Sequence, residues 1–137
     1  MAFPIAGEWN LYANGFNLSL SIGPSADQAT VTGKISEGGQ PSTIQEGKWN
    51  DALRQITFER VIDTGEVQTY TGFLFDLQVP IFPVFLGGTS VMAGTFTSTG
   101  GYENPDKAMV GWGWFAYFVG PVKPKRTGFY RLSGSRP

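Results

Sequence analysis

The chain contains neither cysteine nor histidine. Without cysteine it can form no disulfide and no thiolate metal site. Without histidine it lacks the commonest general base, the commonest metal ligand and every nucleophile arrangement that depends on an imidazole. We therefore expect a binding protein, not an enzyme, and no cofactor.

Charged residues are also scarce. They make up 15% of the 137 residues, and the formal net charge is -1. Such a chain lacks the positive electrostatic potential that would attract the phosphate backbone of a nucleic acid, so we expect no nucleic-acid partner. Basic residues cluster only at Lys123-Pro124-Lys125-Arg126, which we interpret as a solvated linker.

Long apolar runs are missing as well. No stretch reaches the roughly 18 apolar residues needed to span a bilayer, so we expect no membrane partner. The N-terminus shows no basic region followed by an apolar run, which is the pattern of a signal peptide. A cytoplasmic location is the default expectation, although a processed secreted chain would have the same sequence.

Short strands and turns dominate what is present. The 19 glycines and 9 prolines suit many turns, and no window shows an apolar period of 3.6 residues over helix length. In 16–22, apolar residues alternate with polar ones, which is typical of a half-buried strand. Eight segments are predicted as strands: 5–12, 16–22, 29–36, 44–49, 55–62, 67–77, 91–97 and 112–119.

Eight consecutive strands in a single domain of residues 1–137 predict an antiparallel β-meander. Its stable form is a closed eight-stranded up-and-down barrel, because closure removes exposed edges. A β-trefoil remains the alternative, since Gly7-Glu8-Trp9-Asn10 is echoed by Gly47-Lys48-Trp49-Asn50 at a period of about 40 residues. A further short strand at 127–132 is left open.

Large aromatic residues are the first candidates for a ligand site, because such sites combine apolar walls with a few polar groups. For Trp9 and Trp49 we prefer the interpretation that they plug the barrel floor. Asn10, Tyr12, Asn14, Gln68 and Tyr70 are the candidate polar contacts. The predicted ligand-binding set is Asn10, Tyr12, Asn14, Gln68, Tyr70, Phe96, Trp112 and Trp114.

Two other arrangements need weighing. Glu59, Glu66 and Asp76 could be interpreted as the paired carboxylates of a glycoside hydrolase. However, Glu66 is expected in a turn and Asp76 at the end of a strand, so we prefer the interpretation that these side chains are solvated at the surface. Tyr70 and Tyr117 could stack against sugars together with tryptophan, which makes a lectin the alternative function.

The segment Val79–Leu86 is unusually apolar for a loop. Loops that face water are usually polar, so this segment either covers the barrel or packs against another subunit. We favour the subunit interface and therefore expect a homo-oligomer, either a dimer or a tetramer.

Four motifs in order carry a family resemblance. They are Gly7-Glu8-Trp9, Thr32-Gly33, Tyr70-Thr71-Gly72 and Trp114-x-Ala116-x-x-Val119-Gly120. With these motifs, which span most of the chain, the sequence resembles the avidin and streptavidin family. The resemblance implies an eight-stranded barrel that binds biotin at its mouth, commonly as a homotetramer. It also implies that Trp114 contributes to the site of a neighbouring subunit.

The chain departs from this family at positions that hold the ureido group of biotin. Ile35 stands where the family has a tyrosine, Val122 stands where it has an asparagine, and Asn10 is displaced by one residue. Each unpaired polar group in a dry pocket costs roughly 1–3 kcal/mol. These departures predict altered or weakened biotin affinity and a more apolar ligand.

Overall fold

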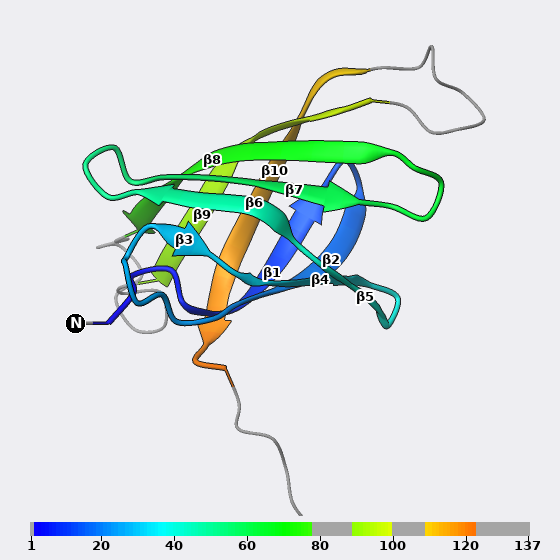
Figure 1. Ribbon diagram of the computed structural model, residues 1–137. Coiled ribbons are helices and arrows are strands. Elements are labelled where there is room, and N and C mark those ends of the chain that lie inside the picture. Colours follow the sequence, from blue (N-terminus) through cyan, green and yellow to red (C-terminus); the bar gives the residue numbers. More distant parts are fainter. Residues whose placement is uncertain (1, 78–88, 100–108, 123–137) are drawn as a thin grey trace, which may run out of the picture.

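A computed structural model describes residues 2–77, 89–99 and 109–122 (Figure 1). For residues 76, 77, 89 and 109–111 it describes the backbone only. The apolar segment 79–86, the basic cluster 123–126 and the open strand at 127–132 lie outside the described residues. No helix long and apolar enough to cross a membrane occurs within the described ranges.

Ten antiparallel strands make up the regular structure of the described residues. They are β1 (Gly7–Ala13), β2 (Phe16–Ile22), β3 (Thr30–Val31), β4 (Gly33–Glu37), β5 (Gln40–Thr43), β6 (Gln45–Asn50), β7 (Gln55–Val61), β8 (Val67–Leu77), β9 (Thr89–Ser98) and β10 (Met109–Gly120). The predicted all-β, antiparallel architecture is confirmed.

All ten strands belong to one curled sheet in the order β3-β6-β7-β8-β9-β10-β1-β2-β4-β5. Strands β6 to β10 pair with their chain neighbours, and β10 then pairs with β1. This order favours the up-and-down arrangement over the trefoil alternative.

The strand count differs from the predicted eight for two local reasons. The predicted strand at 29–36 is divided at Thr32, whose carbonyl accepts a hydrogen bond from Gly23 N–H (2.9 Å). The second reason is β5, which lies outside the eight predicted segments and contains Pro41, a residue without a backbone N–H to donate to a sheet. Because β5 stands last in the sheet order, Pro41 can occupy it without a donor on its outer side.

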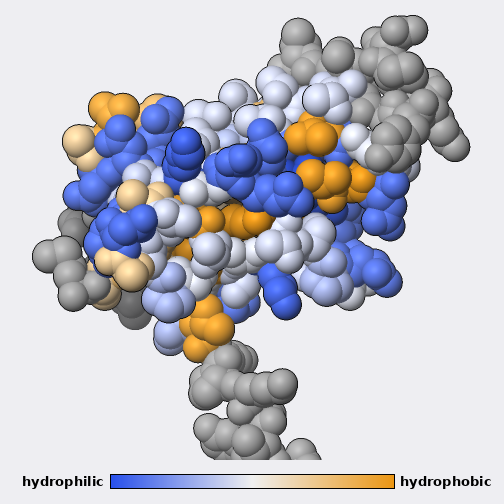
Figure 2. All heavy atoms as spheres, viewed as in Figure 1, coloured by the Kyte–Doolittle hydropathy of each residue, from blue (hydrophilic) through white to orange (hydrophobic). Residues whose placement is uncertain are grey.

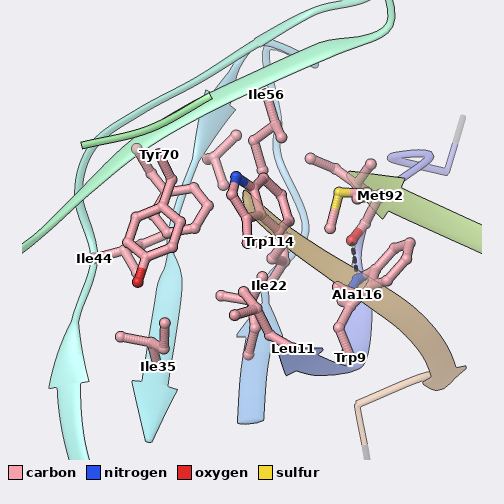
Figure 3. Packing of buried hydrophobic residues seen from close by; sticks show 14 of the residues in the cluster. Trp9, Leu11, Ile22, Ile35, Ile44, Ile56, Tyr70, Met92, Trp114 and Ala116 are labelled. Atoms are coloured by element: carbon pink, nitrogen blue, oxygen red, sulfur yellow. Dashed lines mark hydrogen bonds between the residues drawn. The ribbon is translucent and has the colours of Figure 1, made fainter. Parts of the chain in front are cut away.

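Buried and more exposed residues alternate along the strands, and the buried, inward-facing ones build the core. Trp9, Leu11 and Ala13 of β1 are buried, while the residues between them are exposed or half-buried. Figure 3 shows Trp9 and Trp114 among the aliphatic side chains of the facing strands. Trp9 Nε1 donates to the Ile5 carbonyl (3.0 Å), so its polar atom is paired inside the core.

Trp49 is the second residue interpreted as a barrel plug, and it is buried as well. Its ring meets Phe3 edge-on at 6.5 Å, and Nε1 donates to Asp51 Oδ1 (3.2 Å). Both tryptophans therefore belong to the hydrophobic core.

Aromatic side chains also gather on the outside of the sheet. Figure 2 shows a surface on which hydrophobic side chains form separate patches among hydrophilic ones. On β8, β10 and β1, however, aromatic residues are aligned by register, and Tyr12 stacks on Phe115 at 5.1 Å. We call this set the outer aromatic face: Tyr12, Phe73, Phe75, Phe115 and Tyr117.

Close approach of strands makes glycine obligatory at Gly94. A Cβ there would overlap the carbonyl oxygen of Thr71 on β8, whereas at Gly113 on β10 the nearest atom would be 3.9 Å away. We expect Gly94→Ala to lower the free energy of unfolding by about 1–3 kcal/mol through overpacking, and Gly113→Ala to change it little. Urea unfolding of both variants measures the difference, and equal stabilities would contradict the packing argument.

Candidate functional site

A cavity of about 310 Å³ opens at the end of the sheet that carries the β1–β2 and β7–β8 turns. Its wall combines aromatic and aliphatic side chains with one guanidinium, two carboxylates and two amides. The lining residues are Ala13, Asn14, Phe16, Leu18, Glu37, Arg60, Ile62, Glu66, Gln68, Tyr70, Phe96 and Trp112.

One wall of the cavity is the end of an ordered stack of rings across β7, β8, β9 and β10. Successive members are direct register partners, and their centroids lie 4.8, 4.8 and 5.1 Å apart. Such cross-strand aromatic pairs stabilise a sheet beyond the area they bury. We call this stack the aromatic ladder: Phe58, Tyr70, Phe96 and Trp112.

Trp114 supports the ladder from the core. Its ring lies edge-on to Tyr70 (5.8 Å) and Phe58 (6.3 Å), and its Nε1 lies 3.2 Å from the Thr71 carbonyl and 3.1 Å from that of Thr95. With 3% of its surface exposed, Trp114 is buried beneath the ladder and does not line the cavity.

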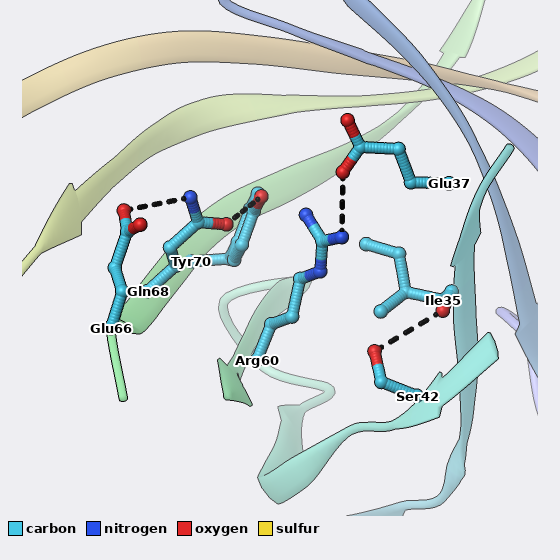
Figure 4. Close-up of polar contacts among 7 residues, drawn as sticks. All are labelled: Ile35, Glu37, Ser42, Arg60, Glu66, Gln68 and Tyr70. Atoms are coloured by element: carbon cyan, nitrogen blue, oxygen red, sulfur yellow. Dashed lines mark hydrogen bonds and ion pairs between the residues drawn. The ribbon is translucent and has the colours of Figure 1, made fainter. Parts of the chain in front are cut away.

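A chain of hydrogen bonds runs along the inward side of β8 and the turn before it (Figure 4). Tyr70 OH donates to Gln68 Oε1 (2.9 Å), and Gln68 Nε2 donates to Glu66 Oε2 (3.2 Å). Glu66 Oε2 also accepts from Ser98 Oγ on β9. These bonds fix the orientation of the Gln68 amide, because its oxygen faces a donor and its nitrogen faces a carboxylate.

Arg60 brings a buried charge to the cavity. It follows Ile56 and Phe58 on the inward side of β7, and 7% of the residue is exposed. Its Nη2 pairs with Glu37 Oε1 at 2.8 Å, while Nε has no hydrogen-bond partner within the described ranges. Pairing is what makes a buried guanidinium tolerable, and Glu37 provides it from β4.

Burial dominates the ionisation of Tyr70. Loss of hydration raises the pKa of its phenol to about 12, although the charge of Arg60 and a hydrogen bond with it act in the opposite direction. The phenol therefore remains a neutral donor across the physiological range.

Five of the predicted ligand-binding residues come together at the cavity. These are Asn14, Gln68, Tyr70, Phe96 and Trp112. Asn10 and Tyr12 lie on the outward side of β1, because the residues that alternate with them fill the core. Trp114 is the eighth member of the set and lies under the ladder.

Three charged lining residues are absent from the predicted set: Glu37, Arg60 and Glu66. The period of two along β7 signals that Arg60 points inward. Glu66 is interpreted from the sequence as solvated surface, yet it is half-buried and bonded to Gln68 and Ser98. The tight turn at Gly65 (φ 85°) returns the chain so that Glu66 faces the cavity.

The other two carboxylates of the hydrolase interpretation do not join Glu66. Glu59 lies on the side of β7 opposite Arg60, and the side chain of Asp76 is outside the described part. No group of three metal-ligating side chains occurs among the described residues.

Comparison of the chain with protein-family models, curated proteins and solved structures found no match.

The buried phenol predicts a specific alkaline behaviour. Because the folded state holds the Tyr70 proton more tightly than the unfolded chain, its stabilising effect is complete below pH 10 and is lost as pH rises toward 12. We expect Tyr70→Phe to be less stable than the unmodified chain by about 1 kcal/mol at pH 7, through loss of the Gln68 bond, and this gap to shrink above pH 10. Urea unfolding between pH 7 and 12 tests this, and a pH-independent gap would contradict it.

Proposed function

We propose that the chain is a non-catalytic small-molecule-binding protein of avidin-like type, with its ligand in the cavity beside the aromatic ladder. The observation that carries this proposal is a pre-formed pocket with an apolar aromatic wall and a few oriented polar groups. That combination is characteristic of ligand sites. The polar chain from Tyr70 to Glu66 is hydrogen-bonded before any ligand arrives, so it can orient one without large rearrangement.

The avidin-like part of this proposal takes the sheet as a closed eight-stranded barrel. β3 and β5 are the two end strands of the sheet order. Along the chain, a single residue separates β3 from β4, and a single residue separates β5 from β6. If β3 and β4 are counted as one strand, and β5 and β6 as the next, these two strands form one hairpin and the ten strands become eight. A bond from Ile44 N–H to the Gly33 carbonyl (3.1 Å) supports continuity of that hairpin.

Biotin is the first ligand to consider, and we propose weakened affinity for it. Ile35 stands where the resemblance calls for a tyrosine hydroxyl, and it is fully buried in the core. The cavity instead offers Gln68 and Arg60 as polar groups. A urea placed here would find fewer oriented donors than the family provides.

A sugar-binding function has less support. Both faces of Tyr70 are covered, by Phe58 and by Phe96, so this ring has no face for a pyranose. Tyr117 is 44% exposed but belongs to the outer aromatic face, on the opposite side of the sheet from the cavity. Retention on a sugar column and elution by free sugar would favour the lectin alternative.

Trp112 provides an internal reporter of binding, because it is the tryptophan that lines the cavity. We expect biotin or a hydroxyazobenzene dye to quench tryptophan fluorescence saturably, at higher concentrations than a strong biotin binder requires. The quenching should be lost in Trp112→Phe and kept in Trp49→Phe, whose indole lies in the core beside Phe3. Absence of saturable quenching by both probes would contradict biotin-type binding.

We further propose that the protein forms a homo-oligomer through the outer aromatic face. Phe73, Phe75, Phe115 and Tyr117 are each between 41% and 53% exposed. They lie on β8 and β10, on either side of β9, whose Val91 and Ala93 are their register partners. Contiguous exposed apolar surface of this kind marks interaction sites, and a two-fold axis lets the same face pair with itself.

Phe75→Lys should dissociate such an oligomer, because the interface would have to bury an unpaired ammonium group. Light scattering coupled to size-exclusion chromatography gives the mass directly. Leu53→Lys is the matched control, since Leu53 is 59% exposed in the β6–β7 turn. A monomeric mass for the unmodified chain at micromolar concentration would refute this assembly.

A further inference from the structure

The charges that line the cavity do not balance. One guanidinium, that of Arg60, faces two carboxylates, those of Glu37 and Glu66. Arg60 and Glu37 form an ion pair at 2.8 Å, which leaves Glu66 in excess. Within residues 2–77, 89–99 and 109–122, no cationic side chain forms an ion pair with Glu66.

The partners of Glu66 are neutral. Its Oε2 accepts from the Gln68 amide at 3.2 Å and from the Ser98 hydroxyl. Both donors stabilise the carboxylate without cancelling its charge. The excess negative charge of the cavity is therefore held in a defined position on the inward side of the β7–β8 turn.

Aromatic rings lie beside this carboxylate. Glu66, Gln68 and Tyr70 follow one another on the inward side, and Tyr70 continues into Phe96 and Trp112 of the ladder. Trp112 is the last ring of the stack, with Phe96 against one side and no other described ring in contact. Electron-rich ring faces next to a carboxylate are the setting in which proteins bind organic cations.

We propose that the cavity binds an organic cation, with an ammonium group at Glu66 and a flat apolar body against Trp112, the last ring of the ladder. This inference rests on the proposed function, which makes the cavity a ligand site. A volume of about 310 Å³ suits a small molecule of this kind. An anionic ligand is disfavoured, because the charge of Arg60 is already paired with Glu37 and the anion would lie close to the second carboxylate, that of Glu66.

Three probes of similar size and different charge test the inference on the unmodified chain. They are benzyltrimethylammonium, phenylacetamide and phenylacetate, each titrated by isothermal calorimetry. We expect the cation to bind at least tenfold more tightly than the neutral probe, and the anion to bind most weakly.

Two matched variants assign the effect to Glu66. Glu66→Gln keeps the size of the side chain and removes its charge, so we expect about a tenfold loss in affinity for the cation and less than a twofold change for phenylacetamide. Glu59→Gln removes a carboxylate from the outward side of the same hairpin and should leave the affinities of all three probes unchanged. Circular dichroism confirms that each variant is folded.

The outcomes separate this inference from the function on which it rests. Equal affinity for cation and neutral probe, or preference for phenylacetate, overturns the charge preference while the cavity remains a ligand site. Absence of binding by all three probes overturns both. Retention of the cation preference in Glu66→Gln also overturns the assignment, because the charge would then act from elsewhere.

Discussion

Register-matched stacking of Phe58, Tyr70 and Phe96 is the contact on which the core and the cavity both depend. The three rings are direct partners on β7, β8 and β9, and their near-parallel planes require those strands to align as they do. A slip of one residue would turn Tyr70 to the opposite side of the sheet. The same contact therefore sets the strand register, seats Trp114 beneath the stack and forms the wall of the cavity.

Arg60 shows how the site and the fold constrain each other. A guanidinium on the inward side of β7 is costly unless a carboxylate meets it, and that carboxylate comes from β4, 23 residues earlier. The ion pair joins two parts of the sheet across the cavity. The same ion pair neutralises the charge of Arg60. The remaining charge in the pocket is that of Glu66, whose hydrogen-bond partners, Gln68 and Ser98, are neutral.

Much of the fold could be predicted from alternation along the chain. The predicted segment 16–22 coincides with β2, because polar and apolar residues alternate there without interruption. The predicted segment 67–77 coincides with β8, which is rich in aromatic and β-branched residues. β5 could not be found this way, since tolerance of Pro41 depends on its place in the sheet. The cavity was predictable in its aromatic and amide residues, but not in Glu37 and Glu66, because neither lies in a local pattern. Their positions follow from hairpins that bring distant strands together.

The pairing of β1 with β10 has a consequence for how the chain is made. Leu11 and Ala116 are partners, although they stand near opposite ends of the described sequence. A ribosome releases β1 long before its partner β10 exists, so β1 and β2 wait as an unprotected hairpin until β10 has been synthesised. Loop closure over such a distance is slow, and we expect the pairing of β1 with β10 to be a late step of folding. An exposed, half-formed sheet edge during that interval is the point at which chaperone assistance would matter most.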